Sequence, residues 1–121
     1  MIHRGDIYFI RMAGRMGKGK AGRCPVLVVS SDALNALPLA VVVVPGTDAS
    51  HLKRDFLSTV RVTARETGLP TDTVFLCHQL RSLDPEKLLE PGDRRPVVAG
   101  RLSRDRMREV EQAIQATLDQ F

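Results

Sequence analysis

Tryptophan is absent from this 121-residue sequence, and cysteine occurs only twice, at Cys24 and Cys77. Two cysteines this far apart give neither a disulfide framework nor the paired spacing of a zinc site, so we expect reduced thiols and no bound metal. The longest apolar stretch, around residues 41–44, is far too short to span a bilayer, and the N-terminus lacks the apolar core of a signal peptide. We therefore expect a cytoplasmic protein without a cofactor.

Acidic residues are fewer than basic ones, which gives a net charge of +4 and an isoelectric point near 9.6. A charge of this sign favours a polyanionic partner, with nucleic acid as the first candidate and an acidic protein segment as the second. The hydrophobic content of 43% is typical of a globular protein. We expect a single domain over residues 1–121, long enough to bury one core.

No acidic residue interrupts the stretch from residue 11 to residue 23, which contains four glycines. Such a segment cannot bury a face, so we predict an exposed loop that ends on an apolar strand at residues 26–29. Its basic side chains either keep a hairpin loop solvated or contact a phosphate backbone, and the unbroken positive charge favours phosphate contact. We expect the functional site to border this junction. The basic residues of the stretch are Arg11, Arg15, Lys18, Lys20 and Arg23.

Short apolar runs predict a chain of strands with few helices, which is a mainly β fold with α, of the α+β class. Strands are expected at residues 7–10, 25–29, 39–44, 57–63, 73–80 and 96–100. Pro45 and Gly46 are expected to end the third strand and to leave Thr47 just past its end. Short helices are expected at residues 33–36 and 85–89.

The C-terminal segment has the pattern of an amphipathic helix, with Ser103 as its N-terminal cap. Its apolar side chains recur at helical spacing and are expected to cover the sheet. A partner-binding helix is the less favoured alternative. The apolar positions are Met107, Val110, Ile114 and Leu118.

Six blocks of sequence, spread almost end to end in the same order, resemble the MazF/PemK-type toxins of bacterial toxin–antitoxin systems. They are Arg4-Gly5-Asp6-Ile7-Tyr8, Pro25-Val26-Leu27-Val28-Val29-Ser30-Ser31-Asp32 with Asn35, Val43-Val44-Pro45-Gly46-Thr47, Gly68-Leu69 with Asp72-Thr73-Val74, Gln79-Leu80-Arg81-Ser82-Leu83-Asp84, and Gly100-Arg101-Leu102-Ser103.

The resemblance implies an SH3-like barrel of five to seven strands that pairs as a homodimer. It also implies a metal-independent endoribonuclease that cuts single-stranded RNA at short sequences, arrests growth, and is held inactive by an acidic antitoxin. Thr47 falls where the family has an active-site threonine. The family usually has an arginine directly before the strand-opening proline, where this chain has Cys24 and carries Arg23 one position earlier. A glutamate common in the family's preceding loop is missing near Gly19.

Metal-free RNA cleavage needs a base for the 2′-hydroxyl, positive charge beside the phosphate and a proton for the departing 5′-oxygen, and it yields a 2′,3′-cyclic phosphate and a 5′-hydroxyl. We expect Arg23 and Thr47 to be catalytic, because a guanidinium can hold two phosphate oxygens and a hydroxyl can donate to one. The base stays open between His51 and His78. The expected RNA-binding residues are Arg15, Lys18, Lys20, His78, Gln79 and Arg81.

Two other functions fit the same fold. A toxin of this kind can instead trap DNA gyrase through its C-terminal helix, here residues 106–121. A non-catalytic relative would bind RNA in a salt-sensitive way without cutting it.

Overall fold

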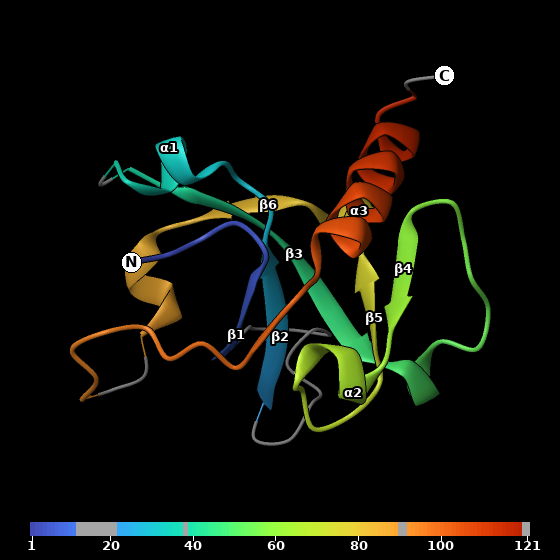
Figure 1. Ribbon diagram of the computed structural model, residues 1–121, viewed down its shortest axis with the longest axis horizontal. Coiled ribbons are helices and arrows are strands. Elements are labelled where there is room, and N and C mark those ends of the chain that lie inside the picture. Colours follow the sequence, from blue (N-terminus) through green and yellow to red (C-terminus); the bar gives the residue numbers. More distant parts are fainter. Residues whose placement is uncertain (12–21, 38, 90–91, 120–121) are drawn as a thin grey trace.

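The strands of this protein form a bent antiparallel sheet, and helix α3 lies across one side of it (Figure 1). The computed structural model describes residues 1–11, 22–37, 39–89 and 92–119. Its elements, in chain order, are β1 (Asp6–Arg11), β2 (Arg23–Val28), α1 (Asp32–Asn35), β3 (Val41–Asp48), η3 (Ala49–His51), β4 (Thr59–Val62), α2 (Ala64–Thr67), β5 (Thr73–Leu76), η4 (Cys77–Gln79), β6 (Arg81–Leu83), η5 (Pro85–Leu88), β7 (Gly100–Arg101) and α3 (Arg104–Thr117). The sheet order is β4-β5-β3-β2-β1-β7, and β6 also pairs with β3. The predicted α+β class is confirmed.

Strand β3 is the centre of the sheet, because its two halves have different partners. The first half pairs with β2 and β6, and the second half pairs with β5. The prediction that Pro45 and Gly46 end this strand is wrong. Pro45 pairs with Val26 at the point where β3 leaves β2, so the missing proline donor breaks no continuing ladder. Gly46 follows, and a Cβ there would lie only 2.9 Å from Cγ2 of Thr73, so glycine allows β5 to approach.

The two faces of the central strands are both packed. On one face, Val26 and Val43 join a buried cluster that includes Tyr8 and is covered by Leu88 of η5. On the other face, which we call the α3 face, Leu27 and Val44 pack with the residues of the terminal helix. Side chains alternate between these faces along each strand. Alternation therefore decides which side of the sheet each candidate residue occupies.

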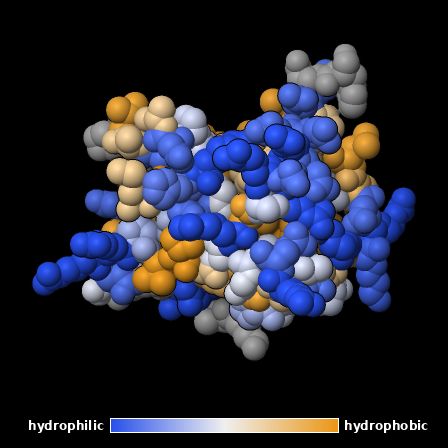
Figure 2. All heavy atoms as spheres, viewed as in Figure 1, coloured by the Kyte–Doolittle hydropathy of each residue, from blue (hydrophilic) through white to orange (hydrophobic). Residues whose placement is uncertain are grey.

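Helix α3 begins as predicted, with the Ser103 hydroxyl accepting a hydrogen bond from the Arg106 backbone N–H. Met107 and Val110 are buried, whereas the predicted core residue Leu118 is the C-cap and is 58% exposed. The guanidinium of Arg106 donates to Glu66 at 2.8 Å and so links α3 to α2. The face drawn in Figure 2 is mostly hydrophilic, with hydrophobic residues exposed over α1 and beside β4.

The predicted strand over residues 73–80 is wrong in its second half. The backbone N–H of Cys77 donates to the Ser58 carbonyl at 2.8 Å, and that of Leu80 donates back to Cys77 at 3.3 Å. These bonds turn the chain through η4 before β6 returns along β3. His78 and Gln79 therefore lie on a turn and do not alternate with strand residues.

The other predicted elements are present with changed limits. The strand expected at residues 96–100 is wrong except for Gly100, which begins β7, and the helix expected at residues 85–89 is a 3₁₀ turn, η5. Helix α2 was not predicted, although Thr63 and Glu66 form a capping box around its first turn. Within the described part of the chain, no helix is long and apolar enough to cross a membrane.

Candidate functional site

Thr47 is the penultimate residue of β3, not a residue beyond the strand as predicted. It pairs with Val74 of β5 and is partly exposed at the rim of the sheet. Its Oγ1 lies 3.3 Å from Nδ1 of His51, which is the last residue of the η3 turn. The structure thus joins the predicted catalytic threonine to one of the two candidate bases.

The η3 turn is fixed at both ends. The Asp48 carboxylate accepts the backbone N–H and the hydroxyl of Ser50 at 2.9 and 2.8 Å, and these hydrogen bonds lower the pKa of Asp48. The backbone N–H of Ala49 donates to the Asp72 carbonyl at 2.8 Å. Arg61 of β4 donates to the Ala49 carbonyl at 3.3 Å. His51 is therefore held on a braced turn while its ring stays exposed.

Arg23 is the first residue of β2, paired with Arg11, and not part of a loop as expected. Its guanidinium carbon lies 5.7 Å from the centre of the Phe9 ring, an arrangement suited to a cation–π contact. Both residues line a cavity of about 300 Å³ together with Asp48 and Thr73. This cavity is on the α3 face, because Pro25, two residues beyond Arg23, also lines it.

Arg23 and Thr47 consequently lie on opposite faces of the sheet. Arg23 lies four residues before Leu27, which packs on the α3 face, whereas Thr47 lies four residues after Val43, which packs on the other face. The cavity lined by both Arg23 and Asp48 agrees with this assignment. The two residues predicted to share one phosphate are separated by the sheet.

Arg81 lies on the same face as Thr47, which we call the Thr47 face. It begins β6 and pairs with Val43. Val43 and Thr47 are four residues apart along β3, so their side chains point to the same face of the sheet. The Arg81 side chain is exposed, and its charge acts on the buried Cys24 thiol. Burial raises the pKa of Cys24 to about 11, and the positive charge of Arg81 opposes that rise. Arg81 therefore supplies positive charge where Cys24 does not.

The remaining predicted residues lie elsewhere. His78 is exposed on η4, and its Nδ1 lies 2.9 Å from the Ser58 hydroxyl. The Gln79 carbonyl accepts a hydrogen bond from Nε of Arg81 at 3.4 Å, which places the Gln79 backbone beside the Thr47 face. The predicted RNA contacts outside the described residues are Arg15, Lys18 and Lys20.

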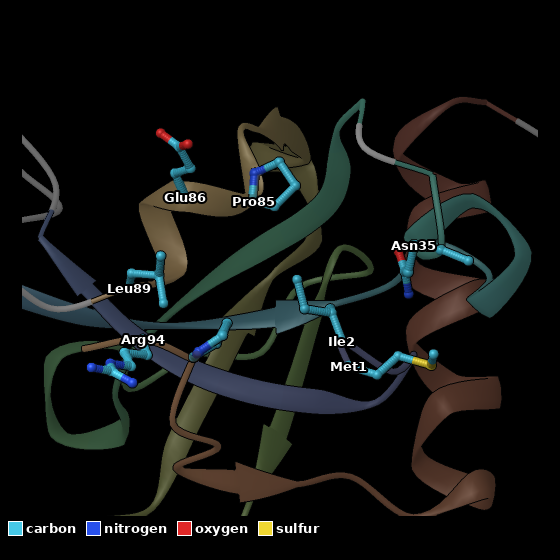
Figure 3. Close-up of a pocket in the computed structure, with 9 residues that line it drawn as sticks. Met1, Ile2, Asn35, Pro85, Glu86, Leu89 and Arg94 are labelled. Atoms are coloured by element: carbon cyan, nitrogen blue, oxygen red, sulfur yellow. The ribbon is translucent and has the colours of Figure 1, made fainter.

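A second cavity, of about 390 Å³, lies between the N-terminus, α1 and η5 (Figure 3). Met1, Ile2 and Asn35 line it from one side, and Glu86 of η5 and Arg94 line it from the other. None of the predicted site residues that the structure describes contributes to its lining. Among the described residues, no group of three or more His, Cys, Asp or Glu side chains is placed to hold a metal ion.

Comparison with known proteins agrees with this architecture. The PemK-like, MazF-like toxins of type II toxin–antitoxin systems match residues 3–118. The chain belongs to this toxin family. It is 28% identical to Endoribonuclease EndoA of Bacillus subtilis over 118 residues, covering 98% of this chain and 95% of that protein. It is 30% identical to Endoribonuclease MazF of Staphylococcus epidermidis over 118 residues, covering 98% and 92%. A mycobacterial endoribonuclease solved with its cognate antitoxin shares the fold, with a TM-score of 0.73, 19% identity and coverage of 98% and 96%.

For this MazF-like toxin, the sequence predicted Thr47 and Arg81 as site residues but did not place them on one face of the sheet. Pairing of Val26 with Pro45 is the observation that assigns the faces, and it depends on a register that the sequence does not state. Because β2 begins at Arg23, the side chains of Arg23 and Cys24 point to opposite faces of the sheet. An arginine at position 23 therefore does not occupy the face that a residue at position 24 occupies.

Proposed function

We propose that this chain is the toxin of a toxin–antitoxin pair and that it cuts single-stranded RNA without a metal ion. The observation that carries the proposal is the Thr47 hydroxyl, which is hydrogen-bonded to His51 and lies on the same face as Arg81. The names of the relatives, EndoA and MazF endoribonucleases, support the reaction class. The products are a 2′,3′-cyclic phosphate and a 5′-hydroxyl.

Each group on the Thr47 face has a distinct role in this proposal. Thr47 donates a hydrogen bond to a non-bridging oxygen of the scissile phosphate. Arg81 stabilises the negative charge that builds on the phosphorus intermediate, because its guanidinium stays protonated and presents parallel donors. Arg23, on the α3 face, keeps its predicted catalytic role only as an alternative to Arg81. Gln79 and His78 extend the RNA contact surface along η4, with Arg15, Lys18 and Lys20 as further phosphate contacts.

A cleavage assay with a long single-stranded RNA in excess EDTA tests this function. The wild-type protein is expected to give discrete fragments whose 5′ parts end in cyclic phosphate, as read by mass spectrometry. Thr47→Val keeps the shape of the side chain and removes the hydroxyl, so cleavage is expected to slow by about 10²-fold.

The matched control is Thr117→Val, which removes a threonine hydroxyl from α3 that donates to the Ala113 carbonyl of the same helix at 2.8 Å. It is expected to cut RNA at the wild-type rate. Absence of cleavage by the wild-type protein, or cleavage that needs added metal, would overturn the proposed function. Equal rates for Thr47→Val and wild type would remove Thr47 from the site.

The proposal extends to partners. We infer an acidic antitoxin because the chain carries a net charge of +4 and a mycobacterial relative of the same fold was solved with its cognate antitoxin. We infer a cytoplasmic homodimer, and large apolar side chains left exposed on the monomer are available for such pairing. Those exposed by about half or more of their area include Leu37, Leu39, Phe56 and Leu57.

A further inference from the structure

Metal-free cleavage through the 2′-hydroxyl requires a base, and the groups assigned so far do not provide one. A guanidinium stays protonated, and a threonine hydroxyl is a weak base. The chain has three histidines. His3 lies beside Asp32, with 3.7 Å between Nδ1 and Oδ2, and His78 bonds to Ser58. His51 is the histidine that bonds to Thr47, and it does so at 3.3 Å.

The hydrogen bond between Thr47 and His51 restricts what each group does. If Nδ1 of His51 carries the ring proton, it donates to Oγ1, and the hydroxyl hydrogen of Thr47 is left to donate to a phosphate oxygen. In that tautomer, Nε2 is an unprotonated acceptor. The same Nδ1 donor persists after Nε2 takes up a proton, because both nitrogens of imidazolium are donors. One geometry therefore orients Thr47 before and after a proton transfer.

The surroundings of His51 suit a group that must meet a substrate. Its ring is exposed, whereas the backbone that carries it is fastened to Asp72 and Arg61. The charged side chains around the turn include Asp48 at the end of β3 and Arg61 of β4, which forms an ion pair with Asp55 at 3.0 Å. A fixed backbone with an accessible ring nitrogen lets a phosphodiester held by Thr47 bring its 2′-hydroxyl to Nε2.

We propose that His51 is the general base of the cleavage reaction, an inference that rests on the proposed function. Nε2 takes the proton of the 2′-hydroxyl while O2′ forms its bond to phosphorus. The P–O5′ bond breaks with its electron pair on O5′, which takes a proton from water. The hydroxide left by that water is neutralised when Nε2 releases its proton. The net products are the 2′,3′-cyclic phosphate and the 5′-hydroxyl.

Two substitutions separate proton transfer from the positioning of Thr47. His51→Asn keeps an amide donor near the place of Nδ1, so it preserves the hydrogen bond to Thr47 and removes the base. His51→Ala removes both. Single-turnover cleavage is measured in EDTA from pH 5 to pH 9, with protein in excess over RNA. Both variants are expected to be slower by about 10²-fold or more and to lose the acid limb of the wild-type profile, where the rate rises with pH.

The control variant is His3→Asn, which is expected to keep the wild-type rate and pH profile. Circular dichroism and binding of an RNA with a 2′-deoxy residue at the cut site confirm that each variant folds and binds. Recovery of wild-type cleavage in His51→Asn, or a slow variant whose acid limb is unchanged, overturns the inference and leaves the proposed function standing. A wild-type protein that does not cleave RNA at all overturns both.

Discussion

Arg81 and Arg23 offer the same chemical group to opposite sides of one sheet, so their side-chain directions decide which of them meets the scissile phosphate. Arg81 faces the side of Thr47 and His51. Arg23 faces a cavity on the α3 face, against Phe9 and near Asp48. An electrostatic contribution to catalysis requires donors within hydrogen-bond reach of the developing charge. The directions of the two side chains therefore favour Arg81 over Arg23 as the arginine that contacts the scissile phosphate.

The prediction at this scale compares two matched substitutions. Arg81→Gln is expected to slow RNA cleavage by about 10²-fold, because it removes positive charge from the face that carries Thr47. Arg23→Gln removes the same charge from the other face and is expected to have a smaller effect. Single-turnover rates on one RNA substrate measure both. The reverse order of effects would return the catalytic role to Arg23.

The other residue that changes the site is Cys24. It stands where the family usually carries an arginine, and here it is buried in the cluster that contains Val26 and Val43. Burial raises its pKa to about 11, so the thiol is neutral at physiological pH and is a packing residue. The positive charge that acts on Cys24 comes from Arg81. Arg81 is on the same face because β6 pairs with β3.

Among the elements, β3 and η3 carry the groups proposed to react, and α3 packs on the other face of the sheet. Met107, Val110 and Ala113 of α3 are buried against the sheet. The apolar face of this helix is thus used in the core, which argues against the gyrase-binding alternative that depends on it. Arg106 links α3 to Glu66 of α2 and to Glu109 of its own helix.

The link between Arg106 and Glu66 predicts a pH-dependent contribution to stability. Hydrogen bonds from Arg106 lower the pKa of Glu66 below its ordinary value. A lowered folded-state pKa adds stability above the unfolded-state pKa and loses it as the pH falls through the folded-state value. In urea unfolding at pH 7, Arg106→Ala is therefore expected to be less stable than wild type by at most about 1 kcal/mol.

At a pH well below the folded-state pKa of Glu66, the two proteins are expected to converge in stability, since Glu66 is then neutral in both states. Arg108→Ala is a suitable control, because the Arg108 side chain is 70% exposed and its ion pair, with Asp105 of the same helix, is long at 3.8 Å. A difference between Arg106→Ala and wild type that stays constant with pH would contradict an electrostatic origin.

For the whole molecule, the excess of positive charge favours binding of an acidic partner, and the exposed apolar side chains favour pairing of two copies of the chain. Leu39 and Leu57 are 68% and 79% exposed, and pairing with a second copy of the chain would remove such apolar area from water. The inferred homodimer is expected to give twice the 13.4 kDa mass of the chain in light scattering.

Leu39→Glu introduces a charge into one of the exposed apolar areas and, if that area pairs, is expected to shift the mass towards that of the monomer. Glu86→Gln, which alters an exposed side chain elsewhere, is the control. A wild-type protein with the mass of a single chain at micromolar concentration would contradict the homodimer.

The sequence by itself determined the class of the fold, the C-terminal helix and the family, because apolar periodicity, caps and ordered motifs are local properties of the chain. The motifs also made Thr47 a candidate site residue. The sequence did not determine the continuation of β3 past Gly46 or the turn at η4, because both depend on partners distant in sequence. The tertiary structure alone decided that Arg23 and Thr47 lie on opposite faces. A strand register places side chains relative to one another, and one residue of difference moves a side chain across the sheet.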